Sequence, residues 1–178
     1  MAVATGITIE DFEALPDALA HNRELVNGEL VNVSGNLGGH NKVRMHLLLR
    51  LALFVEQMAL GEVQTEQEFQ FGDDAHGPDI TFFNPEKAVM FEDRRVQRFV
   101  PDLAVEIAGV RDTFDSLTDK AMKYRRFGVQ DVWVFNVRGR QAFRWSEQGN
   151  AILGEQDSFA SWLIPGFSIR IGELFSRV

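Results

Sequence analysis

The sequence predicts an α/β (α+β) fold in which helices flank a mixed central β-sheet. Three patterns support this prediction: a hairpin signal followed by a long segment with apolar residues at helical spacing, a helical segment between two short apolar runs, and several further short strand patterns. A strand, a helix and a second strand in that order are typical of a crossover that joins parallel strands. Hairpins pair their strands antiparallel, so the sheet is expected to be mixed.

The first third of the chain predicts a short helix, a hairpin and a long core helix. Thr8 precedes an acidic and apolar segment and is a candidate helix N-cap. Asn27-Gly28 lies within a β-forming segment at 23–34 and favours a type I′ turn. Gly38, Gly39 and His40 open a long segment in which apolar residues recur at helical spacing over 43–55, and this pattern ends near Gly61.

The middle of the chain predicts three strands. Apolar and polar residues alternate over 63–71, which indicates one strand with a polar face, and a turn at 73–78 leads into a strand at 80–83. Residues 84–100 show little periodicity and are interpreted as a connection with one helical turn. Leu103–Ile107 is a nearly continuous apolar run, as is typical of a central strand that is buried on both faces.

The last third predicts a helix followed by short strands. Asp115 is a candidate cap for a helix from 116 to 127, and a second buried strand is expected at 132–137. Segments 141–145 and 162–171 predict further short strands that are separated by glycine and proline.

Length and composition limit the functions that the chain can have. A chain of 178 residues fits one domain, here residues 1–178. No segment approaches the roughly 18 consecutive apolar residues of a membrane span, and the N-terminus lacks a signal pattern, so a cytoplasmic protein without membrane contact is expected. Cysteine is absent, which excludes disulfides, thiolate metal sites and a cysteine nucleophile. The remaining carboxylates favour Mg²⁺ or Mn²⁺ as a metal.

The net charge of -8 argues against general nucleic-acid binding, because that affinity comes largely from lysine and arginine. A local basic surface would offset this charge. Three groups are candidates: Arg94, Arg95 and Arg98; Lys123, Arg125 and Arg126; and Arg138, Arg140 and Arg144. The alternative is that these are solvated charges on unrelated faces.

Three charged residues stand in positions that favour chemistry. Glu106 lies inside an apolar run, where an unpaired charge is costly to bury, and it shares a strand face with the small Ala104. Lys120 flanks the sheet-facing stripe of its helix, and Asp79 begins a strand directly after Pro78. Taken singly, a core ion pair, a lysine that reaches solvent and a turn aspartate explain them. Together, two acids and an amine suit a site that holds a hard cation and orients water.

Motifs along nearly the whole chain resemble the Uma-two family of restriction endonuclease homologues. The matching segments are Glu24 to Leu30, His40, Pro78-Asp79-Ile80, Pro101 to Ile107, Lys120, Tyr124, Gly128-Val129, Val132 to Val134 and Pro165-Gly166-Phe167. They occur in order from about residue 8 to residue 176, and the joint pattern is more specific than any single motif.

This resemblance implies the PD-(D/E)XK, or restriction endonuclease-like, fold and magnesium-dependent cleavage of DNA. By analogy Asp79 is the metal-binding acid, Glu106 is the second acid and Ile107 completes the expected metal ligands. The superfamily's usual lysine position is Ala108 here, so the resemblance assigns the catalytic amine to Lys120.

Other positions leave alternatives open. Glu24 matches an additional early acid of the family, and the alternative is a hairpin surface residue. Gly109 and Ser116 stand where the family commonly has serine and aspartate, so a catalytically weak or inactive nuclease-fold module that binds protein or nucleic acid, as a homodimer, remains a second hypothesis.

Four further aromatic or basic residues receive structural interpretations. His40 is interpreted as a capping or packing residue at its helix start, and His76 as a solvated turn residue. Tyr124 and Trp133 lie on apolar-patterned faces and are expected in the core.

Overall fold

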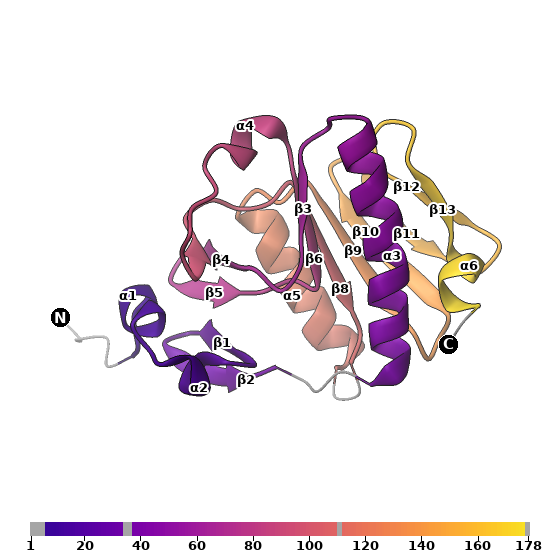
Figure 1. Ribbon diagram of the computed structural model, residues 1–178. Coiled ribbons are helices and arrows are strands. Elements are labelled where there is room, and N and C mark those ends of the chain that lie inside the picture. Colours follow the sequence, from indigo (N-terminus) through magenta and orange to yellow (C-terminus); the bar gives the residue numbers. More distant parts are fainter. Residues whose placement is uncertain (1–5, 34–36, 110–111, 177–178) are drawn as a thin grey trace.

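The computed structural model describes residues 6–33, 37–109 and 112–176 (Figure 1). Its helices are α1 (Ile9–Glu13), α2 (Asp17–Ala20), α3 (Gly38–Gln57), α4 (Pro85–Ala88), α5 (Phe114–Arg126) and α6 (Ile171–Phe175). Its strands are β1 (Arg23–Val26), β2 (Glu29–Asn32), β3 (Glu62–Gln64), β4 (Glu68–Phe71), β5 (Asp74–His76), β6 (Ile80–Phe83), β7 (Val96–Gln97), β8 (Leu103–Ile107), β9 (Asp131–Asn136), β10 (Gln141–Ser146), β11 (Gly149–Leu153), β12 (Ser158–Ala160) and β13 (Ser168–Arg170). Within these ranges, no helix combines the length and apolarity needed to cross a membrane.

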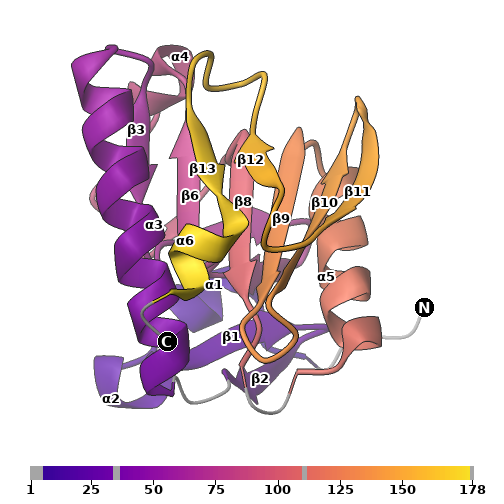
Figure 2. The same ribbon diagram turned by 90° about the vertical axis from the view of Figure 1, so that its right-hand side faces the viewer.

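The central sheet has the order β11-β10-β9-β8-β6-β3 and is mixed (Figure 2). β8 and β9 pair in parallel, and the other neighbours in this sheet pair antiparallel. The chain crosses from β8 to β9 through α5. The predicted strand, helix and parallel strand are therefore confirmed, as is a mixed sheet with helices on its faces.

Strand β8 divides its side chains between two cores. Leu103, Val105 and Ile107 join the core beneath α3, whereas Ala104 packs in the core beneath α5. Because side chains alternate along a strand, Glu106 faces the same side as Ala104. The buried strand therefore presents its one carboxylate toward α5, which carries Lys120.

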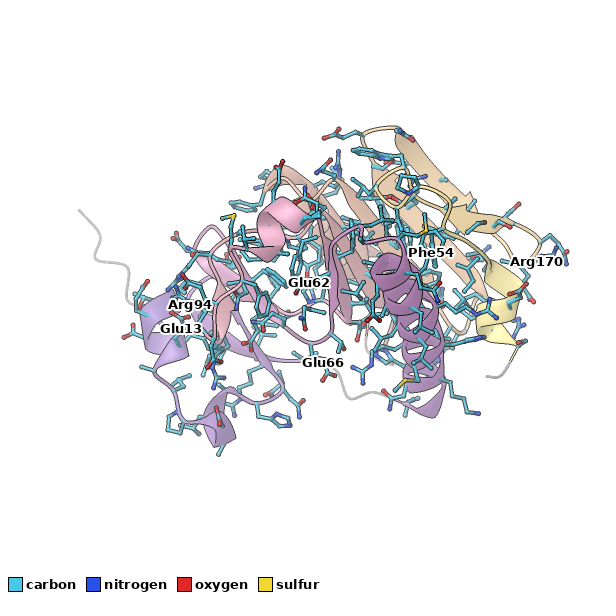
Figure 3. All side chains as sticks on the ribbon, turned by 45° about the horizontal axis from the view of Figure 1, so that its top comes forward. Glu13, Phe54, Glu62, Glu66, Arg94 and Arg170 are labelled. Atoms are coloured by element: carbon cyan, nitrogen blue, oxygen red, sulfur yellow. The ribbon has the colours of Figure 1, made fainter. Side chains whose placement is uncertain are left out.

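A second sheet, of order β2-β1-β5-β4-β7, lies beside the first and packs on α1 and α2. Thr8 caps α1 as predicted. Glu13 of α1 accepts hydrogen bonds from Arg94 and Arg98, and the labelled Glu13 and Arg94 lie side by side in Figure 3. These ion pairs connect α1 to the segment around β7.

Two predictions about the middle of the chain are wrong. The alternating segment 63–71 is two strands, because Glu66 adopts a φ of 55° and the chain leaves the central sheet after β3 to enter the second sheet at β4. The turn expected at 73–78 instead lies at Gly72 and Asp73, and Asp74–His76 forms β5. Apolar and polar residues do alternate over 63–71, but this pattern does not show that β3 pairs in the central sheet and β4 in the second sheet.

Predictions in the C-terminal half differ mainly at element ends. Helix α5 begins at Phe114 rather than Ser116, because Thr113 caps it through a reciprocal capping box with Ser116. Strand β11 follows β10 through a tight turn, so Gly149 is the first residue of a strand rather than a break between strands. In the segment 162–171 only Ser168–Arg170 is a strand, paired with β12.

Two glycines permit close turns. The β1–β2 hairpin has the predicted type I′ geometry, with Asn27 at φ 52° and Gly28 at φ 77°. Gly61 has a φ of 141°, and a Cβ atom there would lie 2.1 Å from the carbonyl oxygen of Phe83. Only glycine therefore lets the chain leave α3 and pass against the end of β6.

A fully buried carboxylate connects the second half of the central sheet to the C-terminal segment. Asp131 of β9 accepts hydrogen bonds from Arg144 of β10 at 2.9 Å and from the hydroxyl of Ser161 at 2.7 Å. A buried carboxylate that loses its cation keeps the cost of desolvation without compensation.

Replacing Arg144 by methionine is expected to lower the free energy of unfolding by about 3 kcal/mol, because Asp131 then keeps, among the described residues, only the Ser161 hydroxyl as a side-chain donor. The matched control is Arg50→Met, whose partner Glu173 forms an exposed pair at 2.7 Å and whose loss is expected to cost less than about 1 kcal/mol. Urea unfolding of both variants at neutral pH measures the difference, and equal losses would contradict the assignment.

Candidate active site

A cleft of about 750 Å³ lies between the second sheet and the face of the central sheet that carries α5. Its lining includes four acids or amines that the sequence singled out, namely Glu24, Asp79, Glu106 and Lys120. Strands β1 and β8, the residue before β6, and helix α5 contribute them. The structure thus brings the four residues to one place from segments that are far apart in the sequence.

The register of two antiparallel strands sets Asp79 beside Glu106. Ile80 of β6 pairs with Val105 of β8, and one further step along this register places Asp79 opposite Glu106. The main-chain N–H of Ile107 donates to Asp79 Oδ2 at 2.7 Å, which fixes the aspartate at the end of β8. Both carboxylates therefore project from one end of the sheet.

Lys120 bridges two acids across the cleft. Its Nζ lies 2.9 Å from Glu24 Oε1 and 3.0 Å from Glu106 Oε1. The hydroxyl of Tyr124, one helical turn later, also donates to Glu106 Oε1 at 2.7 Å. Lys120 and Tyr124 both contact Oε1 of Glu106, and within the described ranges no donor is found for Oε2. Glu106 is one of the residues that line the cleft.

Burial and neighbouring charges set different proton affinities for these groups. Burial raises the pKa of Glu106 despite the opposing charge of Lys120, and the negative charges of Asp79 and Glu24 raise it further. The pKa of Glu24 is lowered because Lys120 and His76 together outweigh the effect of burial. Burial disfavours the charge of Lys120, but Glu106 and Glu24 raise its pKa. Lys120 is therefore an ammonium ion at neutral pH, and Glu24 is ionised.

His40 belongs to this site rather than serving only as a cap. Its Nε2 lies 2.9 Å from Asp79 Oδ1, and its side chain is buried at the start of α3. Since a carboxylate accepts, Nε2 carries the hydrogen, and Nδ1 has no hydrogen-bond partner among the described residues. The imidazole thus holds the second oxygen of Asp79 in place.

His76 is buried, with 4% of its surface exposed, so its interpretation as a solvated turn residue is wrong. Its Nδ1 lies 2.9 Å from Glu24 Oε2, and the ammonium of Lys123 lies 3.3 Å from its Nε2. Lys123 donates, so Nε2 is the acceptor and Nδ1–H is the donor to Glu24. Burial lowers the pKa of His76, which agrees with this neutral tautomer.

The residues that sequence reasoning underestimated are His40, His76 and Tyr124. Tyr124 is in the core, as expected, but its hydroxyl contacts Glu106. Its position four residues after Lys120 placed both on one helix face, and this spacing was the available signal. The histidines carried no such signal, because each one's partner lies 39 or 52 residues away. Trp133 is buried in the core, as predicted.

The three basic groups do not form one free positive surface. Most of their members are engaged within the chain: Arg94 and Arg98 with Glu13, Arg95 with Asp17, Lys123 with Asp74, Arg125 with main-chain carbonyls, Arg140 with Glu155 and Arg144 with Asp131. Of these, only Arg95 lines the cleft, together with Arg23 and Lys120.

The donor set fits a hard divalent cation bound by few protein ligands. Asp79 is close enough to Glu106 for its negative charge to raise the pKa of Glu106, and carboxylate oxygens are preferred by Mg²⁺ and Mn²⁺. Since the N–H of Ile107 points to Asp79, its carbonyl points to the same side of β8. In the described ranges no cluster of three or more acidic or histidine side chains suits a metal. Mg²⁺ does not need such a cluster, because proteins usually hold it with one or two carboxylates, water and substrate.

Gly109 and Ser116, the two positions that depart from the family pattern, line the cleft. Ser116 Oγ contacts the N–H and carbonyl of Thr113 and so serves the cap of α5. The N–H of Gly109 donates to Asp112 at 2.7 Å. Neither adds a carboxylate to the pair formed by Asp79 and Glu106.

Replacing Lys120 by methionine is expected to lower the free energy of unfolding by about 3–5 kcal/mol at neutral pH, because two buried acids lose their shared cation. Adding Glu24→Gln to this variant is expected to restore part of the loss, since one of the two negative charges is removed. Urea unfolding in the presence of a chelator measures both effects. A loss below about 1 kcal/mol for Lys120→Met would show that the bridge is not important for stability.

The stability of the fold is expected to depend on pH through Glu68, which lines the same cleft. Burial raises its pKa from 4.5 to about 7, with Glu24 and Glu13 adding to the shift against Arg95. The folded state then binds more protons than the unfolded state between these values, so the contribution of Glu68 to stability falls as pH rises through this window. The variant Glu68→Gln should gain stability relative to the parent from pH 5 to pH 8, as measured by thermal unfolding. A constant difference would contradict this.

Comparisons with known proteins identify the family and the fold of this chain. The model of the Uma2 (Uma-two) family, described as "Putative restriction endonuclease", matches residues 9–171. A crystal structure of "a putative nuclease belonging to DUF820" from Anabaena variabilis ATCC 29413 is similar with a TM-score of 0.84 and 19% identity, over 96% of this chain and 98% of that chain. No curated protein matches. The structural match confirms the expected restriction endonuclease-like fold, and, since the family model spans most of the sequence, this protein belongs to the Uma2 family.

Proposed function

We propose that this protein is a divalent-metal-dependent endonuclease that hydrolyses phosphodiester bonds in DNA. The observation that carries this proposal is the pair of carboxylates, Asp79 and Glu106, set side by side by the β6–β8 register with the Lys120 ammonium 3.0 Å from Glu106. Phosphodiester cleavage needs an oriented water and compensation for the charge that develops on the phosphate. Two acids and one amine at the rim of a cleft supply both.

The proposed metal ligands are Asp79, Glu106 and the main-chain carbonyl of Ile107, which are oxygen donors of the kind that Mg²⁺ and Mn²⁺ favour. A bound ion of this kind lowers the pKa of a coordinated water and neutralises charge on a phosphate oxygen. The hydrogen bonds from His40 and Ile107 hold Asp79 in one orientation before a cation arrives. The acids are therefore preorganised, which reduces the cost of binding.

Lys120 acts as a cation in this proposal and not as a base. Its pKa is raised by the two acids that it contacts, so it keeps its proton at neutral pH. A protonated amine beside Glu106 can donate a hydrogen bond to a water or to a phosphate oxygen, and thereby orient the nucleophile or stabilise negative charge. Glu24 and Tyr124 are positioning residues, because they fix Lys120 and Glu106 through hydrogen bonds.

The charge of the cleft also favours a metal-dependent reaction. Its described lining contains the acids Asp17, Glu24, Glu66, Glu68, Asp79, Glu106 and Asp112, whereas its lysines and arginines are Arg23, Arg95 and Lys120. Such a surface attracts divalent cations and repels a bare phosphate backbone. A divalent cation held by the acids would reduce this negative charge, so DNA binding is expected to depend on the metal.

A binding module without catalysis is the second candidate. It is favoured by Gly109 and Ser116, which replace the common serine and aspartate, and by the net charge of -8. Calorimetric titration with Mn²⁺ separates the two functions. Binding that is lost in Glu106→Gln supports the enzyme, and the absence of binding to the parent protein supports the module.

The catalytic proposal predicts that Glu106→Gln lowers the rate of Mg²⁺- or Mn²⁺-dependent plasmid nicking by at least about 100-fold. The amide keeps the size of the side chain and an oxygen for the Tyr124 hydroxyl, so the fold should be retained, but a negative metal ligand is lost. Asp79→Asn is expected to have the same effect.

The matched control for these variants is Glu147→Gln, which changes an exposed acid outside the lining of the cleft and should leave the rate unchanged. Far-UV circular dichroism verifies folding. Nicking that persists in a chelator, or that is equal in Glu106→Gln and the parent, would contradict the proposed roles.

A further inference from the structure

Helix α3 carries an exposed apolar stripe on the side away from the core. Met45, Leu49 and Leu53 each expose between 54% and 55% of their surface. They recur every four residues, so they lie on one face of the helix. The buried residues of α3, Val43, Leu47, Leu51 and Val55 among them, fall on the opposite face at 100° per residue. In Figures 1 and 2, no other described helix or strand covers this outer side of α3.

Two opposite charges end the stripe at equal distances from its centre. Lys42 and Glu56 lie seven residues before and after Leu49, within about 20° of its direction on the helix, and both are exposed. In the part of the chain that the structure describes, neither forms an ion pair, whereas nearby Arg50 is engaged by Glu173. From its N-terminal to its C-terminal end, the stripe therefore has a positive residue, three apolar residues and a negative residue.

This order is self-complementary when two helices run antiparallel. With Leu49 on a two-fold axis, Met45 faces Leu53 of the second copy, and Lys42 faces Glu56 of the second copy. A parallel arrangement instead places like charges opposite each other at both ends. We propose that α3 is the homodimer interface of this protein, formed by antiparallel packing of residues 42–56 of two copies about a two-fold axis at Leu49.

A second copy fits this surface because an isologous contact uses the same patch twice, and this patch supplies both halves of each contact. Each interface contains two symmetry-related ion pairs that flank the apolar centre. The contact extends over about 21 Å of helix, which is at the small end for stable interfaces. The dimer is therefore expected to dissociate on dilution.

Single cysteines test both the interface and its direction, because the chain has no cysteine of its own. Packed helices about 8–10 Å apart bring facing Cα atoms close enough for a disulfide. On the axis, Leu49→Cys is expected to form a covalent dimer under mild oxidation. Lys42→Cys and Glu56→Cys alone should not, because the two copies of each position lie about 21 Å apart along the helix. A mixture of these two variants should cross-link.

Charge exchange gives an independent test by sedimentation equilibrium over roughly 1–300 μM protein, a range that spans weak association. Lys42→Glu is expected to weaken dimerisation about tenfold, and the double variant Lys42→Glu with Glu56→Lys should restore it, because the pairs re-form with reversed sign. Leu49→Asp should abolish the dimer, and its thermal midpoint verifies that an exposed substitution leaves the fold intact.

The outcomes separate this interface from other arrangements. A parent protein that stays monomeric over the whole range, a dimer that Leu49→Asp leaves unchanged, or cross-linking of Lys42→Cys alone would each overturn the proposal. None of these results depends on nuclease activity, so these experiments test the interface independently of the catalytic assignment.

Discussion

The contact on which the site depends is the ammonium of Lys120 held between Glu24 and Glu106. It joins a strand of the second sheet, a strand of the central sheet and the helix between β8 and β9, so it is tertiary in origin. Without a cation at this point, two buried acids would face each other across the cleft, and the two sheets would repel where they meet. The lysine therefore stabilises the fold and prepares the cleft for chemistry through the same hydrogen bonds.

Each acid of the site is held by at least two neighbouring groups. Asp79 is held by a main-chain N–H and by His40, Glu106 by Tyr124 and Lys120, and Glu24 by His76 and the N–H of Gly77. Support from groups that are themselves buried restricts the rotamers of the carboxylates. Oε2 of Glu106 nevertheless has no donor among the described residues, so one oxygen of this cleft residue is not already engaged by a hydrogen bond.

Local patterns in the sequence predicted the elements that carry the site, because β8, α5 and β9 are continuous apolar or amphipathic runs. The burial of Glu106 followed from its neighbours alone. The division of 63–71 between two sheets was not predictable in this way, since no glycine or proline marks the change at Glu66. The role of His76 depends on Glu24, 52 residues earlier in the chain. Contacts of this range are decided by strand order, which no local pattern encodes.

The close approach at Gly61 has a consequence for mutational tolerance. Any side chain there would overlap the carbonyl of Phe83 at the end of β6, and Asp79 immediately precedes the other end of that strand. Replacements at position 61 would displace the strand and, with it, the aspartate. A survey of substitutions scored by loss of activity would therefore rank this glycine with the acids of the cleft, although it has no chemical group to offer.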